Sequence, residues 1–169
     1  AKDLSYCQVS GLSVSPDNTK LSYGIDILSR RIFTINIKDL TSGKMLKDKI
    51  LGVSPFAAWA ADSESFFYTS KDEETLRTDK IFRHEIGSTQ ADDTMVFEEK
   101  DETFYTFVYP SKSREYIMIG STSTMTSEYQ FLPSNKPKDK FKFIQKRQRG
   151  LEYDVAHFED MFYISTNAG

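Results

Sequence analysis

Residues 14–26 read VSPDNTKLSYGID, and residues 57–70 read AAWAADSESFFYTS. Each stretch contains a short apolar run, a turn-like segment with Asp and Ser, and then a run rich in aromatic and β-branched residues. Aromatic and β-branched residues favour strands, whereas Pro, Asp, Asn and Ser favour the turns between them. Each stretch therefore predicts two strands joined by a tight turn, and their similarity indicates an internal repeat.

The same pattern occurs four times along the chain. The four turns are centred on Asp17, Asp62, Ser113 and Glu159, which are 45, 51 and 46 residues apart. The strand-like runs that follow these turns read LSYGID (21–26), FFYTS (66–70), EYIMIGS (115–121) and MFYISTN (161–167). A recurrence of this length indicates that one supersecondary unit is repeated.

Two further strand-like runs complete each full unit. Third strands are predicted at 30–37 (RRIFTINI), 80–86 and 127–132, and fourth strands at 44–51, 94–100 and 141–147. In the first of these runs Phe33, Ile35 and Ile37 alternate with polar residues, as in a half-buried strand. The polar segment DEETLRT (72–78) is predicted to be a loop between a second and a third strand rather than a helix.

Four strands per repeat of this length are typical of a β-propeller blade. We therefore predict an all-β fold, a β-propeller fragment of about three and a half four-stranded antiparallel blades, with units at about 9–52, 53–100, 101–150 and 151–169 in a single partial domain (1–169). A β-sandwich is the alternative, but it gives no reason for a repeat of four strands. Propellers close with ~4–8 blades. We expect the chain to belong to a larger ring, and its open blade edges to permit self-association.

Composition narrows the possible functions. Apolar residues make up 38% and charged residues 28% of the chain, and the net charge is -3, so we predict neither nucleic acid nor a membrane as a partner. Cys7 is the single cysteine, which excludes an internal disulfide and a cysteine-rich zinc site. No signal-peptide pattern is present. We expect a cytoplasmic protein, and we expect it to need no cofactor.

No catalytic or metal-binding residue is assigned. The nucleophile-elbow pattern G-x-S-x-G is absent, and the nearest stretch, GLSVS (11–15), lacks the second glycine. His84 and His157 are the only histidines, and without matching carboxylate or cysteine spacing we expect them to be surface or packing residues. No phosphate-binding glycine loop occurs.

Three charged stretches need an interpretation. The basic run KPKDKFKFIQKRQR (136–149) predicts an edge strand protected by lysines, and EEKDE (98–102) predicts a loop between blades.

Arg30 and Arg31 begin a predicted strand, so their side chains are expected to point to opposite faces. At least one of them is a candidate for a contact with a second domain or with the central channel. The alternative for this pair is simple exposure to solvent.

Several stretches resemble one known family. These are LSRR (28–31), WAADS (59–63), RHEIG (83–87), EEKD (98–101) and RGLEYDVAHFEDMFYISTN (149–167). Together they resemble the propeller domain of the prolyl oligopeptidase family, and within it the oligopeptidase B, or protease II, group. The resemblance extends along nearly the whole chain.

The resemblance implies a two-domain serine peptidase. In that family a seven-bladed propeller covers an α/β-hydrolase domain that carries the Ser, Asp and His triad, and oligopeptidase B members cleave short peptides after Arg or Lys. No triad residue maps onto this chain, so the hydrolase domain is expected to lie elsewhere in the same parent chain and this portion to be inactive alone. The alternative is a non-enzymatic propeller that serves as a scaffold or protein-binding module.

Overall fold

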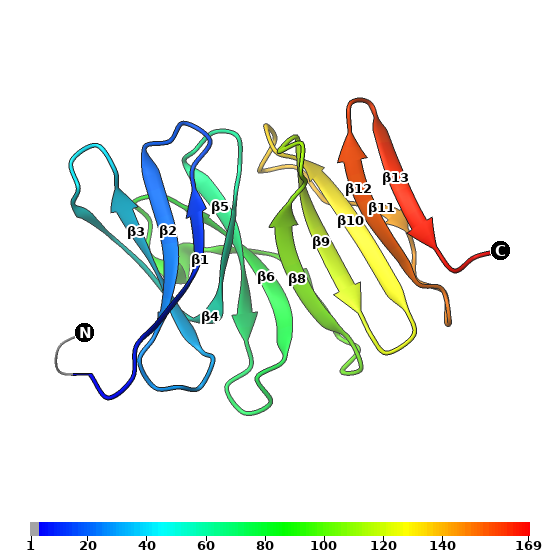
Figure 1. Cartoon of the computed structure of the whole chain (residues 1–169), viewed down its shortest axis with the longest axis horizontal. Coiled ribbons are helices and arrows are strands. Elements are labelled where there is room, and N and C mark those ends of the chain that lie inside the picture. The colour runs from blue at the N-terminus through cyan, green and yellow to red at the C-terminus, as the bar shows by residue number, and fades with distance from the viewer. Residues whose placement is uncertain (1–3) are drawn as a thin grey trace.

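In a computed structural model of the chain, residues 4–169 are described, and they are built from antiparallel strands (Figure 1). The one helical element in this range is a short 3-10 turn, η1 (Gln90–Asp92). No helix in the described part of the chain is long and apolar enough to cross a membrane. The prediction of an all-β chain is confirmed, and the segment 72–77 is a loop as expected.

The strands form three sheets. The first sheet has seven strands hydrogen-bonded in chain order, and the second has four, in the order β11-β10-β9-β8. The seven are β1 (Gln8–Val14), β2 (Lys20–Asp26), β3 (Phe33–Asp39), β4 (Met45–Trp59), β5 (Ser65–Lys71), β6 (Thr78–Glu85) and β7 (Thr94–Glu98). The four are β8 (Tyr105–Pro110), β9 (Tyr116–Thr122), β10 (Ser127–Pro133) and β11 (Lys142–Gln145). A hairpin of β12 (Tyr153–Phe158) and β13 (Met161–Thr166) follows.

Strand β4 is longer than the sequence predicted. A separate strand was expected at 44–51, but β4 continues to Trp59. Its first part pairs with β3 and its second part with β5, and Val53 pairs with both Phe33 and Ser70. Gly52, with a φ of 72°, lies where the register with β3 shifts. Apart from Gly52, with its positive φ, the residues that join the two parts stay within the strand, and β4 ends one group of four strands and begins the next.

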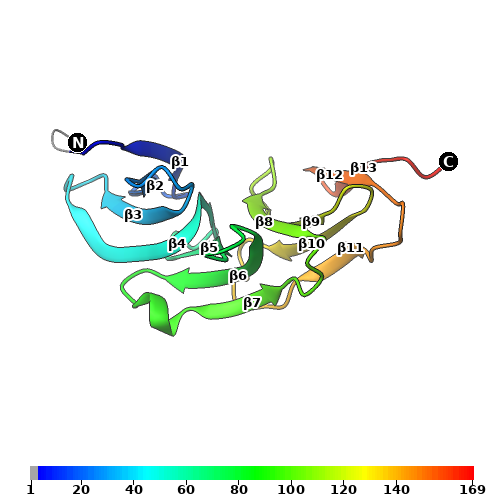
Figure 2. The same ribbon diagram turned by 90° about the horizontal axis from the view of Figure 1, so that it is seen from below.

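The strands therefore stack in successive groups, which Figure 2 shows from below. The first group is β1, β2, β3 and the start of β4; the second is the end of β4 with β5, β6 and β7; the third is β8 to β11. The hairpin β12–β13 begins a fourth. These groups follow the predicted order of four strands per repeat.

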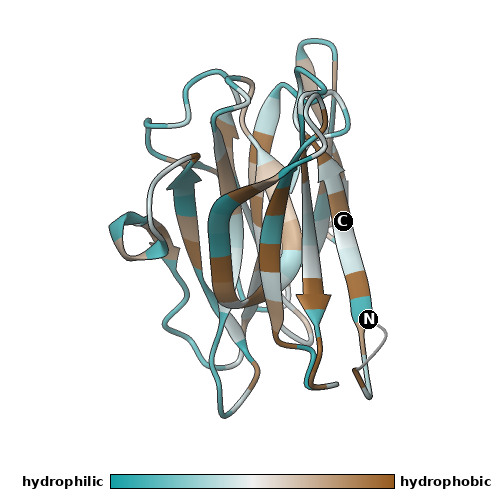
Figure 3. Cartoon of the chain, turned by 90° about the vertical axis from the view of Figure 1, so that its left-hand side faces the viewer, coloured by the Kyte–Doolittle hydropathy of each residue, from teal (hydrophilic) through white to brown (hydrophobic). Residues whose placement is uncertain are grey.

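Two apolar clusters hold the groups together. The first lies between the first and second groups and contains Ile35, Ile37, Ile50, Val53, Ala57, Trp59, Phe66 and Tyr68. The second lies between the second and third groups and contains Ala58, Ala60, Phe67, Ile81, Val108, Ile117, Ile119 and Leu132. Apolar and polar residues alternate along the strands (Figure 3). Burial of each large apolar side chain stabilises the fold by about 1.5–3 kcal/mol.

Three of the four repeated turns share one backbone form. Asn18, Ser63 and Arg114 each adopt a left-handed conformation, with φ between 58° and 62°. The fourth turn differs from the expected repeat, because Phe158 pairs directly with Met161 across a two-residue connection. His157, the first residue of the turn predicted at 157–160, consequently lies within β12 and pairs with Phe162.

Candidate functional site

Five connections gather at one end of the strand groups, at the lower edge of Figure 1. They are the segments 27–32, 72–77, 99–104, 123–126 and 146–152, and we call this region the loop end. Hydrogen bonds tie these connections to one another. The Arg77 guanidinium donates to the carbonyl oxygens of Glu99, Asp101 and Phe104 at 3.3, 3.2 and 3.0 Å. The loop end is therefore a cross-linked surface rather than a set of independent loops.

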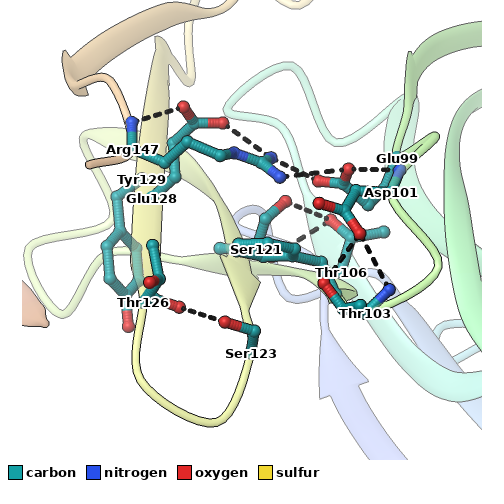
Figure 4. A network of polar contacts seen from close by, with 12 residues as sticks. Glu99, Asp101, Thr103, Thr106, Ser121, Ser123, Thr126, Glu128, Tyr129 and Arg147 are labelled. Atoms are coloured by element: carbon teal, nitrogen blue, oxygen red, sulfur yellow. Dashed lines mark hydrogen bonds and ion pairs between the residues drawn. The ribbon is translucent and has the colours of Figure 1, made fainter. Parts of the chain in front are cut away.

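Arg147 lies at the centre of the polar network in Figure 4. Its two terminal nitrogens bind both carboxylate oxygens of Glu99, and Nη2 also binds Oε1 of Glu128 at 3.0 Å. The backbone N–H of Arg147 donates to the other oxygen of Glu128 at 2.8 Å. The guanidinium carbon lies 3.9 Å from the centre of the Phe104 ring, a cation–π geometry.

The electrostatics of this network favour a permanently charged arginine. Burial alone would lower the pKa of Arg147, but the hydrogen bonds and charges of Glu99 and Glu128 outweigh burial and raise that pKa further above its ordinary value. The side chains of Glu99 and Glu128 are only 4% and 7% exposed. The planar guanidinium group is well suited to bidentate binding of a carboxylate.

The network joins two sheets at the loop end. Glu99 follows β7 of the seven-stranded sheet, whereas Glu128 lies on β10 and Arg147 follows β11 in the four-stranded sheet. Beside it is a cavity of about 490 Å³, lined by Asp101, Thr103, Phe104, Ser123, Thr124, Met125, Thr126, Arg147 and Arg149. The sequence correctly placed 99–102 in a loop and an edge strand within 136–149, but Glu98 ends β7, and the strand expected at 94–100 stops two residues earlier. It did not predict the pairing of Arg147 with Glu99.

Arg30 and Arg31 lie in the loop 27–32, not at the start of a strand, because β3 begins at Phe33. The carboxylate of Asp26, 1% exposed, accepts the N–H groups of Leu28 and Arg31 at 2.8 and 2.7 Å. Ser29 and Arg31 both have a φ of 57°. The prediction that Arg30 and Arg31 begin a strand is therefore wrong, and the alternation of their side chains, which required an extended backbone, no longer follows from it.

Both arginines are nevertheless available to a partner. Each is exposed, and neither guanidinium forms an ion pair with residues 4–169. The loop carries an exposed Leu28 beside them, and Lys71 from the neighbouring β5 donates to the carbonyl oxygen of Arg31 at 2.7 Å. A cavity of about 340 Å³ lies at the base of the loop, bordered by Arg30 and Glu73. The interdomain or channel contact of Arg30 and Arg31 stays a prediction.

Both histidines are buried rather than exposed at the surface. His157 Nδ1 lies 2.8 Å from the hydroxyl of Ser113, and its ring packs against Tyr116 and Phe162. His84 is not isolated, because Asp93 and Asp48 lie at its two ring nitrogens. In the range 4–169, no cluster of His, Cys, Asp or Glu is arranged to hold a metal ion.

Comparison with known proteins identifies the family. The model of the "Prolyl oligopeptidase, N-terminal beta-propeller domain" matches residues 1–169. Dipeptidyl aminopeptidase BI of Pseudoxanthomonas mexicana is 35% identical over 163 residues, which are 96% of this chain and 22% of that protein. Protease 2 of Moraxella lacunata is 33% identical over 171 residues, covering 100% of this chain and 25% of that protein.

Solved structures agree with these sequence matches. Oligopeptidase B from Leishmania major superposes with a TM-score of 0.94 at 29% identity, covering 100% of this chain and 24% of that one. Oligopeptidase B from Trypanosoma brucei superposes with a TM-score of 0.89 at 26% identity, covering 99% of this chain and 24% of that one. The chain thus spans about a quarter of the relatives that it matches, and the predicted propeller fold is confirmed. It belongs to the prolyl oligopeptidase family, as part of the N-terminal β-propeller domain.

Proposed function

We propose that this chain is part of the propeller that covers the catalytic domain of a serine oligopeptidase, and that the parent protein hydrolyses short peptides. The observation that carries the proposal is the family match along all 169 residues. The peptidase names of the relatives support it, as does their greater length, which leaves room for a catalytic domain.

The physical role of such a propeller is selection by size. A ring of blades over an active site excludes folded proteins, whereas short peptides reach the serine and its oxyanion hole in the hydrolase domain. This role requires the connections around the ring to keep their shape. The hydrogen bonds of Arg77 and the ion pairs of Arg147 supply that rigidity at the loop end.

Cleavage after Arg or Lys is the proposed specificity. The likeness to the two oligopeptidase B structures supports it, and the structure from Trypanosoma brucei carries covalently bound antipain. The substrate pocket itself would belong to the hydrolase domain of the parent chain. Arg30 and Arg31 would lie at the contact with that domain, where guanidinium groups pair well with carboxylates.

A probe of the full-length parent protein tests the proposal. Labelling by a fluorophosphonate serine-hydrolase probe is expected, with cleavage of short peptides after Arg or Lys and no cleavage of a folded protein that contains the same sequence. Absence of labelling on an intact, folded parent would overturn the peptidase and favour a scaffold propeller. If the probe labels the protein but cleavage shows no preference for Arg or Lys, only the proposed specificity is overturned.

A further inference from the structure

A buried charged cluster lies away from the loop-end network, between the first and second strand groups. His84 on β6 is completely buried. Its Nδ1 lies 2.7 Å from Oδ1 of Asp93, which follows η1, and its Nε2 lies 3.1 Å from Oδ1 of Asp48 on β4. The side chains of Asp48 and Asp93 are 4% and 1% exposed. One imidazole thus bridges two buried carboxylates from different strand groups.

With both flanking carboxylates ionised, this geometry requires protons on both ring nitrogens. A neutral imidazole has one N–H and one lone pair, so it can donate to only one of two carboxylates. Each carboxylate also accepts a hydrogen bond from a second donor. Asp48 accepts one from the backbone N–H of Gly87 at 2.6 Å, and Asp93 accepts one from the hydroxyl of Tyr68 at 2.8 Å. The doubly protonated imidazolium is the form in which every one of these contacts is a hydrogen bond.

Among residues 4–169, His84 is the only cation paired with the two carboxylates of the cluster. From β5, Phe66 packs on the imidazole with ring centres 5.1 Å apart, and Tyr68 faces Asp93. The neighbours of His84 on β6 point elsewhere, since Arg83 pairs with Glu85 and donates to Pro137.

The cluster fastens a whole segment to β4. Gly87 begins the segment 87–93, and Gln90 within it exchanges two hydrogen bonds with the backbone of Leu51, at 2.9 and 3.0 Å. Asp93, the last residue of the segment, contacts the His84 ring through Nδ1. Release of the imidazole from Asp48 would therefore loosen the contact between β4 and the connection that joins β6 to β7.

We propose that Asp48, His84 and Asp93 form a pH-sensitive clasp between the first two strand groups, closed while His84 is an imidazolium and opened by loss of its proton. Burial lowers the pKa of His84, but the hydrogen bonds to Asp93 and Asp48 outweigh burial and raise it above the ordinary 6.5. A raised pKa means that the stabilisation is complete below the ordinary value and is lost as the pH rises through the folded-state value. The clasp therefore opens on the alkaline side.

Hydrogen exchange of the full-length parent protein, followed by mass spectrometry from about pH 6 to about pH 9, tests the clasp. After correction for the intrinsic exchange rate, peptides covering 48–53 and 87–93 should lose protection with rising pH. The loss should approach about tenfold per pH unit above the transition, the limit for release of one proton. Constant protection across this range would overturn the proposal.

Three variants sharpen the test. His84→Gln is expected to show low protection in these peptides with no transition. Asp48→Asn should weaken the transition, because an amide can serve either a protonated or an unprotonated Nε2. His157→Gln is the matched control, since His157 contacts the Ser113 hydroxyl and no carboxylate, and it should keep the wild-type profile. A wild-type transition in His84→Gln would overturn the assignment even if one of the other variants failed to fold.

Discussion

Arg147 and Glu99 form a two-point ion pair that joins the two largest sheets across 48 residues of chain. Arg147→Ala should lower the free energy of unfolding by about 3 kcal/mol, because removal of one partner leaves the other buried charges uncompensated. Urea denaturation of the variant measures the loss. Arg149→Ala is the control: Arg149 is exposed and forms no ion pair in the described range, so a change within about 0.5 kcal/mol is expected. Equal losses in the two variants would contradict the role of the pair.

Gly11 sets the distance between β1 and β4. It lies in an irregularity of β1 with a φ of 67°, and a β-carbon there would overlap the carbonyl oxygen of Pro55. Gly11→Ala should therefore destabilise the chain by about 3 kcal/mol or more, from backbone strain and steric overlap together. Gly43→Ala separates the two effects, because Gly43 has a similar φ of 71° with open space around it. Its cost should be only about 1–2 kcal/mol, and thermal unfolding compares the two.

Asp26 determines the shape of the loop that carries Arg30 and Arg31. Asp26→Asn should cost about 1–3 kcal/mol, because the amide nitrogen would face a backbone N–H that now has an acceptor. Faster hydrogen exchange in 27–32 should accompany this loss. Asp72→Asn is the matched control in the neighbouring loop. There a single carboxylate oxygen accepts both N–H groups, those of Glu74 and Thr75, so an amide can keep both bonds.

Charge reversal of Arg30 and Arg31 tests the proposed contact with the catalytic domain. In the full-length parent, Arg30→Glu with Arg31→Glu should lower kcat/KM for a short peptide by about tenfold at low salt, because like charges would then face each other. Small-angle scattering should show a more open molecule. Lys112→Glu, an exposed change in the turn 111–114, should leave both readouts unaltered. If the double variant behaves like the wild type in both measurements, the proposed contact is wrong and the two arginines are simply exposed to solvent.

Sequence patterns predicted the strands well because each strand leaves a local signal. The alternation of Phe33, Ile35 and Ile37 is reproduced as a buried face, and the polar loop 72–77 connects β5 to β6 as expected. The predictions were wrong where a distant or buried group controls the backbone. The start of β3 was misplaced because Asp26 holds Leu28 and Arg31 in a loop. β4 was divided because the boundary expected between residues 52 and 53 falls within it, where its register with β3 shifts.

The candidate sites depended on long-range pairing that no local pattern reveals. Arg147 lay in a basic run that predicted only an exposed edge, yet its partner Glu99 is 48 residues away. His84 lacked a carboxylate at any recognised spacing, and Asp48 is 36 residues away. Opposite charges alone cannot select these partners among the many acidic residues of the chain. The family resemblance, in contrast, used matches spread along the chain, and it is confirmed.

The unbroken course of β4 has a mechanical consequence. A load applied along the chain would pass from the first strand group to the second through a continuous hydrogen-bonded strand, with no slack segment to extend between them. Between the second and third groups the load would instead reach the connection 99–104, which is held by side chains of Arg77 and Arg147. In a single-molecule pulling experiment the first two groups should therefore yield together, as one cooperative unit.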